Sequence, residues 1–329
     1  MLVTGAAGFL ASYLVDTVAT ANRIGLLAKP CKLTLLLRTM PHDGHRLAHL
    51  DGGPDVEFLQ ADVNQAYVLD KGLTHIVHAA SAASPIAFRE DPFGTVDANT
   101  VGLRRLLEHA ATSDVRSMLF FSSSEVYGDP PADELPTRED SPCRTGFTGP
   151  RARYAESKRF GETLADLFHE VASVPIKVVR PFHVHGPGLR LDDGRIVAEL
   201  IRQGLRERRL HLLSDGRATR CYGYAADATL GFLLALLSDH EGMAFNIGAD
   251  QPETTILELA SAIASILGLE PPLPARTPLP AYLQGAPARS RPDLTRARDL
   301  LGYAPWTSLE AGLERTIAWQ RAQGAGRGV

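Results

Sequence analysis

The sequence has few cysteines, no long apolar run and little surplus charge. Its three cysteines, Cys31, Cys143 and Cys221, are scattered over 329 residues and predict neither a disulfide framework nor a metal site. Unpaired thiols are typical of a reducing compartment, so a cytoplasmic location is expected. No apolar run reaches the length of a transmembrane helix, and no membrane partner is expected. The formal net charge of -4 offers no general surface for nucleic acid.

What remains is the composition of an ordinary globular protein, with 44% hydrophobic and 22% charged residues. The length allows one large domain or two closely joined ones. The chain opens directly on a short strand and a glycine turn, so no signal peptide is expected.

Apolar runs that fit buried parallel strands alternate with helical patterns through the first half of the chain. This alternation predicts an α/β fold with a Rossmann-type doubly wound parallel sheet. Strands are expected at 1–3, 33–37, 56–63, 75–81, 117–122, 176–181 and 244–248, with short ones at 211–213 and 221–222. Helices are expected at 100–111, opened by Asn99, at 154–172, and at 258–267, capped by Thr254 or Thr255. The stretch 128–149 is expected to be a surface loop that forms a lid or a substrate-side wall, and 271–292 to wrap the surface.

The first strand runs into Thr4-Gly5-Ala6-Ala7-Gly8, and a helix that begins with Phe9 and Leu10 follows. A glycine turn in this place is typical of the phosphate-binding corner of a dinucleotide fold. Gly5 makes the tight turn, and Gly8 lets the backbone approach a pyrophosphate at the helix N-terminus.

Tyr154 and Lys158 are four residues apart, so their side chains face the same way on a helix. An ammonium beside a phenol lowers the pKa of the phenol, and tyrosine can then act as a base near neutral pH. Taken alone, such a pair is more often a solvated surface pair. However, Ser122-Ser123-Ser124-Glu125-Val126-Tyr127-Gly128 precedes it, at the end of an expected strand, where ligands bind in open parallel sheets.

The glycine turn, the serine stretch and the Tyr-Lys pair, in this order, resemble the extended short-chain dehydrogenase/reductases. Within them the pattern is similar to the NAD-dependent epimerase/dehydratase family, and most of all to its UDP-glucuronate decarboxylases. The resemblance implies transient oxidation of a nucleotide sugar at C4 by a tightly bound nicotinamide. Tyr154 would take the hydroxyl proton, Lys158 would hold the nicotinamide ribose, and Ser123 would bond to the same sugar oxygen.

The pair Ser124-Glu125 decides the reaction that the resemblance implies. The family's 4,6-dehydratases carry Asp-Glu there, whereas Ser-Glu is typical of the decarboxylases, in which the glutamate manages the C5 proton. Without the aspartate no acid is left to protonate a leaving hydroxyl. A nucleotide-sugar 4-epimerase, a 4,6-dehydratase and an NADPH-dependent carbonyl reductase remain alternatives. A binding protein that senses NAD(P) is the non-enzymatic alternative, although such proteins usually lose the Tyr-Lys pair or the serine.

The resemblance also implies a cofactor site for NAD or NADP. The strand 33–37 ends at Arg38, where NAD enzymes place an acid. Arginine suits the 2′-phosphate of NADP, but it can also lie flat over adenine. Ala11 fills the place of the family's third glycine. The expected cofactor-binding residues are Gly5, Ala7, Gly8, Phe9, Leu10, Arg38, Asp62, Val63, Ala79, Ala80, Ser81, Asn99, Tyr154, Lys158, Pro181 and His183.

The expected substrate is a nucleotide sugar with an anionic group. Arg220 can bind a carboxylate or a diphosphate by the same bidentate fork, and Arg195 lies in a family-like Asp-Gly-Arg turn. His183 stands where the family commonly has an asparagine, so the sugar or nucleotide can be atypical. The expected substrate-binding residues are Ser84, Ser124, Glu125, His183, Arg195, Arg220 and Arg291.

The resemblance divides the chain into two domains. Residues 1–181, with 222–248 returning to them, are expected to form the NAD(P)-binding Rossmann domain. Residues 182–221 and 249–329 are expected to form a smaller C-terminal α/β substrate domain. A homodimer is also expected, because the helices 100–111 and 154–172 carry apolar residues on more than one face. These residues include Leu103, Leu106, Leu107, Leu164, Leu167 and Phe168.

Overall fold

A computed structural model describes residues 1–42, 45–275 and 286–325. At its centre lies a seven-stranded parallel sheet with the strand order β10-β6-β5-β4-β1-β2-β3. The strand order reverses between β1 and β4, which is the switch point where ligands bind in such sheets. The fold class expected from the sequence is therefore confirmed. The strands are β1 Leu2–Thr4, β2 Leu33–Leu37, β3 Val56–Gln60, β4 His75–His78, β5 Ser117–Phe121, β6 Ile176–Pro181 and β10 Ala244–Ile247.

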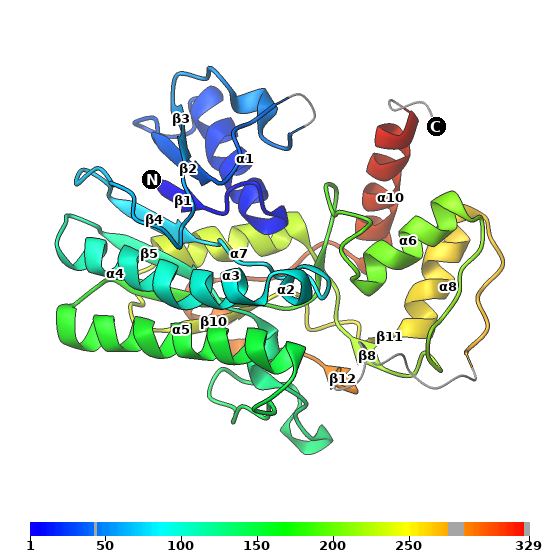
Figure 1. The fold of residues 1–329 in the computed structure, drawn as a ribbon. Helices are drawn as coiled ribbons and strands as arrows, with labels where there is room; N and C mark the ends of the chain where they lie inside the picture. The colour runs from blue at the N-terminus through cyan, green and yellow to red at the C-terminus, as the bar shows by residue number, and fades with distance from the viewer. Residues whose placement is uncertain (43–44, 276–285, 326–329) are drawn as a thin grey trace.

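Helices cover both faces of the sheet (Figure 1). One face packs against α1 Phe9–Arg23, α7 Ala225–Leu237 and α9 Thr295–Leu301. The other packs against α4 Leu103–Ala111 and α5 Pro150–Ala172, beside which lie α2 Ala87–Glu90, α3 Pro92–Asp97 and the π-turn η2 Ala98–Gly102. Shorter 3₁₀ turns occur at η1 Ala48–Leu50, η3 Ser124–Tyr127 and η4 Ala132–Glu134.

A second group of helices lies beside the carboxyl ends of the strands (Figure 1). It contains α6 Ile196–Arg206, α8 Ile256–Leu267 and α10 Leu309–Ala325, which share a separate apolar cluster. Two small sheets join it to the large one. The strand β8 Thr219–Arg220 pairs with β11 Thr254–Thr255 and β12 Arg289–Ser290, and β7 Val184–His185 pairs with β9 Gly223–Tyr224.

The helix expected to open at Asn99 begins earlier. Asp91 caps α3 by accepting from the N–H of Gly94, and the helical run then continues through η2 into α4. Asn99 is buried inside the π-turn, where its Nδ2 donates to Ser157 Oγ of α5 at 2.9 Å. Its amide therefore joins two helices instead of capping one. The expected cap of α8 is confirmed at Thr255, which forms a capping box with Glu258.

Other expected boundaries shift. β3 and β4 end at Gln60 and His78, three residues before the expected ends, because the chain leaves the sheet at these residues. No strand forms at 211–213, because the N–H of His211 donates to the side chain of Gln203 and Leu212 packs into the apolar cluster of α6, α8 and α10. The strand expected at 221–222 is also absent, since these residues lie between β8 and β9. The expected surface stretch 271–292 falls partly outside the described residues.

Four of the six residues that predicted a dimer face instead pack inside the chain. Leu103, Leu106, Leu107 and Leu164 are buried against the sheet, because the inner faces of both helices cover it. The outer face of this helical layer still exposes Phe160, Leu167 and Val171, each by half or more.

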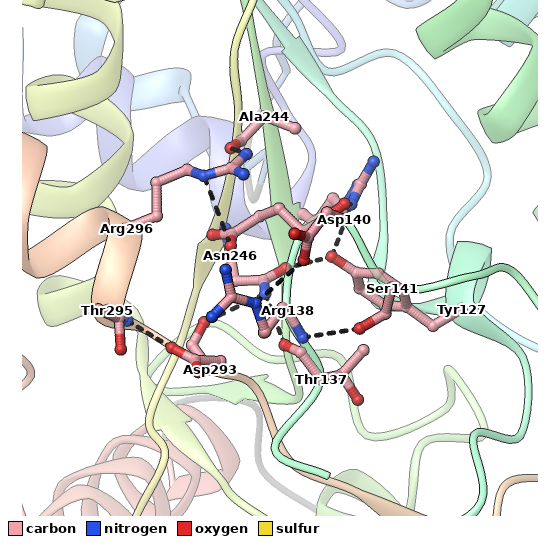
Figure 2. A network of polar contacts seen from close by, with 12 residues as sticks. Tyr127, Thr137, Arg138, Asp140, Ser141, Ala244, Asn246, Asp293, Thr295 and Arg296 are labelled. Atoms are coloured by element: carbon pink, nitrogen blue, oxygen red, sulfur yellow. Dashed lines mark hydrogen bonds and ion pairs between the residues drawn. The ribbon is translucent and has the colours of Figure 1, made fainter. Parts of the chain in front are cut away.

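A buried polar network fastens the long loop after η3 to the sheet (Figure 2). The N–H of Asn246 in β10 donates to Glu139 Oε1 at 2.9 Å. The Nδ2 of the same residue donates to the carbonyls of Thr137 at 2.9 Å and Asp293 at 3.2 Å. Its Oδ1 accepts from the Tyr127 hydroxyl at 2.7 Å. One amide thus holds the loop, the segment before α9 and the end of η3 together.

Among the described residues, no helix is both long and apolar enough to cross a membrane.

Asn246→Ala is expected to lower the free energy of unfolding by about 3 kcal/mol. The carbonyl of Asp293 loses its donor, the Tyr127 hydroxyl loses its acceptor, and the carbonyl of Thr137 keeps only the N–H of Asp293. Denaturant titration followed by circular dichroism measures this loss. Asp140→Ala in the same loop is the control. Within the described ranges Asp140 pairs only with Arg138, both side chains are exposed, and the loss of this pair should not move the midpoint. Equal midpoints for both variants would contradict the role of Asn246.

Candidate active site

The turn between β1 and α1 is built for close approach. Gly5 has a φ of +65°, and a Cβ on it would lie 2.6 Å from Ala80 Cα at the end of β4. Gly8 follows as the first residue before α1, and no side chain caps its end of the helix. The N–H groups of the first helical turn are therefore available for a phosphate. This cradle fits the diphosphate of a dinucleotide.

A cavity of about 800 Å³ extends from this turn to the second group of helices. Cavities of this size are typical of cofactor and small-molecule sites. Fourteen of the residues expected at the site line it: Gly8, Phe9, Leu10, Ala79, Ser81, Ser123, Ser124, Glu125, Tyr154, Lys158, Pro181, His183, Arg195 and Arg220.

Tyr154 and Lys158 project from α5 into the cavity, and both side chains are buried. The Lys158 Nζ donates to the carbonyl of Phe121 at 2.5 Å, at the end of β5, and lies 5.9 Å from the centre of the Tyr154 ring. Ser123 follows the same strand, lies close enough to Tyr154 to lower the pKa of its phenol, and accepts from the N–H of Glu125 at 3.2 Å. The expected trio of tyrosine, lysine and serine is thus brought together.

The pKa of Tyr154 differs from the expectation. Burial raises the pKa of Tyr154 to about 12, although the hydroxyl of Ser123 and the charge of Arg195 act in the opposite direction. Burial also lowers the pKa of Lys158 to about 7, although Glu162 acts against this shift. In the protein alone, Lys158 therefore does not make Tyr154 a base at neutral pH. A further positive charge beside the phenol is needed.

Glu125 lies opposite Arg151, a residue of the first turn of α5 that the sequence analysis did not place in the site. The Nη2 of Arg151 is 2.7 Å and 2.6 Å from the two carboxylate oxygens, and both side chains line the cavity. The spacing of Arg151 from Tyr154, three residues on one helix, is the signal that could have found it.

Phe88 is a second residue that the sequence analysis missed. It comes from α2, and its ring stacks on Tyr154 with centres 5.3 Å apart and an angle of 14° between the planes. It lines the cavity and contributes to the burial of the phenol. No spacing along the chain relates Phe88 to Tyr154, because the contact exists only in the folded protein.

His183 is partly buried in a positively charged part of the wall. Burial, and then the charges of Arg220, Arg151 and Arg195, hold its pKa well below the usual 6.5. Its Nε2 is 2.9 Å from Ser290 Oγ. The hydroxyl of Tyr222 is buried in the same wall without a partner in the described part of the chain. This region provides a neutral imidazole and a phenol for a polar ligand among several cations.

The remaining expected residues do not line this cavity. Gly5, Ala7 and Ala80 stand behind it, in and against the glycine turn. Arg38 is exposed beyond β2, Asp62 bonds to the N–H of Asn64, and Val63 packs on Gly102. Asn99 joins α5, and Ser84 and Arg291 lie outside the lining.

The loop 128–149 does not line the cavity either, although the sequence suggested a lid or a wall. It supports the wall from behind, since Asp129 Oδ1 accepts from the N–H of the lining residue Ala288 at 3.0 Å.

The sequence model of the NAD dependent epimerase/dehydratase family matches residues 1–248. The chain belongs to this family. Among its relatives is UDP-glucuronic acid decarboxylase 1 of Arabidopsis thaliana, 32% identical over 97% of this chain and 69% of that protein. UDP-glucuronic acid decarboxylase 1 of Xenopus tropicalis is 31% identical over 98% of this chain and 72% of its own length.

The fold also matches a solved member of the epimerase/dehydratase group. A UDP-glucuronic acid 4-epimerase variant from Bacillus cereus, in complex with UDP-4-deoxy-4-fluoro-glucuronic acid and NAD, has a TM-score of 0.84. It is 25% identical, and the match covers 98% of this chain and 99% of the other. Membership of the epimerase/dehydratase family confirms the predicted family, the enzyme class and the dependence on NAD or NADP.

Lys158→Met tests whether burial lowers the pKa of Lys158. Between its folded pKa of about 7 and its usual value of 10.5, the unfolded chain keeps a proton that the folded chain has released. The stability of the wild type should therefore rise with pH across this window. Without cofactor, the variant should be more stable by about 3–5 kcal/mol near neutral pH, and this advantage should shrink as the pH approaches 10.5.

Denaturant titrations of both proteins at several pH values measure the difference. The lost hydrogen bond to Phe121 changes the free energy of unfolding by the same amount at every pH. The test is therefore how the stability difference between the two proteins changes with pH. A difference that stays constant with pH would contradict a lowered pKa of Lys158.

Proposed function

We propose that this protein decarboxylates UDP-glucuronate through transient oxidation of the sugar at C4. The observation that carries the proposal is the position of Ser124 and Glu125, on the wall of the same cavity as Tyr154 and Lys158. The relatives named UDP-glucuronic acid decarboxylases, which match nearly the whole chain, support it. The three arginines of the wall suit an anionic substrate.

The cofactor would be held by the turn at Gly5 and Gly8, with its diphosphate at the N-terminus of α1. The Ser81 hydroxyl, buried in the lining without a partner among the described residues, provides a further contact. When bound in its oxidised form, NAD or NADP supplies a reversible hydride acceptor with a positively charged ring. Exposed Arg38 suits a 2′-phosphate or an adenine ring, so the choice between NAD and NADP stays open.

Tyr154 would take the proton of the C4 hydroxyl, and Ser123 would hydrogen-bond to the same oxygen. The phenol starts with a pKa of about 12, so it depends on positive charge that arrives with the cofactor. Phe88 and the burial of the phenol keep water away from this proton transfer. Lys158 would bind the nicotinamide ribose, as its place beside Tyr154 allows.

The C4 ketone makes the sugar a β-keto acid. The C5–C6 bond then breaks, carbon dioxide leaves, and the electron pair moves to the C4 oxygen as an enolate. Glu125 is the acid–base group for the proton that C5 must regain. Return of the hydride to C4 would leave the reaction without a net redox change.

Ser124 argues against dehydration, because a leaving hydroxyl would find no aspartic acid at this position. The second candidate is 4-epimerisation of an acidic nucleotide sugar, supported by the similarity to the Bacillus cereus epimerase. We also propose that residues 1–181 with 222–248 hold the cofactor, and that residues 182–221 and 249–329 hold the nucleotide sugar.

The test is incubation of the purified protein, with NAD and separately with NADP, with UDP-glucuronate, followed by mass spectrometry of the sugar. A UDP-pentose and released carbon dioxide are expected, whereas an unchanged mass with a new retention time would mean epimerisation. Tyr154→Phe is the control, with at least a hundredfold loss expected, because about two orders of magnitude are typical for removing such a base. Glu125→Gln should accumulate reduced cofactor, seen by its absorbance, since it spares the first oxidation.

We further propose a homodimer that pairs the outer faces of α4 and α5. The exposed Phe160, Leu167 and Val171 are spaced to share one face of α5, and Val101 of η2 is also exposed. Exposed apolar residues gathered on one helical layer are typical of an interface.

Light scattering at micromolar concentration should give twice the mass of the chain. Leu167→Glu with Val171→Glu should shift the mass to that of a monomer, because buried unpaired charges are costly. Trp306→Glu, a control at an exposed residue outside this layer, should leave the mass of the dimer unchanged. A monomeric wild type would refute the dimer.

A further inference from the structure

The ion pair between Glu125 and Arg151 engages only one of the three guanidinium nitrogens. A single nitrogen, Nη2, serves both carboxylate oxygens, at 2.7 Å and 2.6 Å. The contact is therefore end-on, and not the two-nitrogen fork that arginine forms with a carboxylate when both are free to align. No other hydrogen bond to this guanidinium occurs within the described residues. Its remaining N–H groups are available, and the side chain lines the cavity.

The surrounding wall carries more positive than negative charge. Arg195 and Arg220 line it together with Arg151, and all three charges act on His183. Arg195 is 3.6 Å from Asp193, so part of its charge is balanced. Arg220 donates to the carbonyls of Thr219 and Pro287 at 2.7 Å and 2.6 Å, which leaves its charge without a paired carboxylate among the described residues. Such a wall favours a ligand with more than one anionic group.

The positions of the cations along the cavity assign the anionic groups. Arg151 precedes Tyr154 by three residues on α5, so both project from the same face of the helix at the reacting end. Arg220 belongs to β8, next to Tyr222, and acts on Glu125 through its charge alone, whereas Arg151 contacts Glu125 directly. A carboxylate on the sugar therefore fits beside Arg151, and a diphosphate fits beside Arg220.

We propose that Arg151 selects an acidic sugar by bridging Glu125 and the carboxylate of the substrate. This inference rests on the proposed function and names the residue that recognises its substrate. A sugar carboxylate near Glu125 would be repelled, because two carboxylates in one site disfavour each other. Arg151 lies against Glu125 and has N–H groups left for a second carboxylate, so it offsets this repulsion. A neutral hexose leaves those N–H groups without an anion and gains nothing from Arg151.

Arginine is suited to this bridge in a way that lysine is not. Its planar fork can donate to two carboxylates through different nitrogens, whereas an ammonium acts as a compact point charge. Arg151→Lys should therefore recover part of the selectivity that Arg151→Gln removes. A purely structural role of Arg151 would not depend on which sugar is offered.

The experiment compares the affinities of UDP-glucuronate, UDP-glucose and UDP by calorimetry in the presence of NAD, with all Arg151 and Arg153 variants built on Tyr154→Phe so that the ligand is not converted during the titration. In Arg151→Gln the affinity for UDP-glucuronate should fall about 10- to 100-fold, the range of a lost charge-assisted hydrogen bond. The affinities for UDP-glucose and UDP should change by less than about threefold, within the scatter expected of an uninvolved site. Arg153→Gln removes the same charge from an exposed position of α5 and should change none of the three.

An equal loss for all three ligands, or no loss for UDP-glucuronate, would overturn the role of Arg151. Circular dichroism shows whether each variant is folded. A folded Arg151→Lys variant that does not prefer UDP-glucuronate over UDP-glucose would also overturn the role of Arg151. Carbon dioxide release by the wild type is measured in parallel. Selective loss without carbon dioxide release refutes the decarboxylase and retains the acid-selecting Arg151. Release together with an unselective loss refutes Arg151 alone.

Discussion

The buried ion pair between Arg180 and Glu162 holds together the elements that carry the chemistry. Arg180 lies on β6 and Glu162 on α5, with Arg180 Nε and Glu162 Oε1 2.9 Å apart. Glu162 also accepts from the hydroxyl of Ser122 at the end of β5, and Arg180 donates to the Tyr127 hydroxyl at 2.6 Å. One pair thus sets the end of the serine strand, the turn after it and the helix of Tyr154 relative to one another. Breaking a buried pair leaves an uncompensated charge, so the arrangement resists small shifts.

The same pair affects the chemistry through Lys158. Glu162 follows Lys158 by one helical turn and supports its charged form against burial. Near neutral pH, Lys158 is therefore close to the midpoint of its titration, and the neighbouring phenol of Tyr154 is protonated. The charge of a bound ligand can shift the protonation of both groups.

The sequence was sufficient wherever a local pattern determines the structure. The apolar run Ile176–Pro181 became a strand with the expected bounds, and Thr255 was found as a cap because a capping box is local. Asn99 was misread, because an asparagine before an apolar helix reads as a cap unless Ser157 of another helix is known to take its amide. Of the residues beside Tyr154, one could be predicted from the sequence and one could not. Lys158 follows from helical spacing, whereas Phe88 depends on how distant segments pack.

The three-stranded sheet of β8, β11 and β12 has a consequence for the order of assembly. It joins segments near residues 219, 254 and 289, and Arg220 is held by the carbonyl of Pro287. All strands of the large sheet, in contrast, are complete by Ile247. During synthesis from the N-terminus, the chain can therefore complete the strands of the large sheet well before it can close the far wall of the cavity.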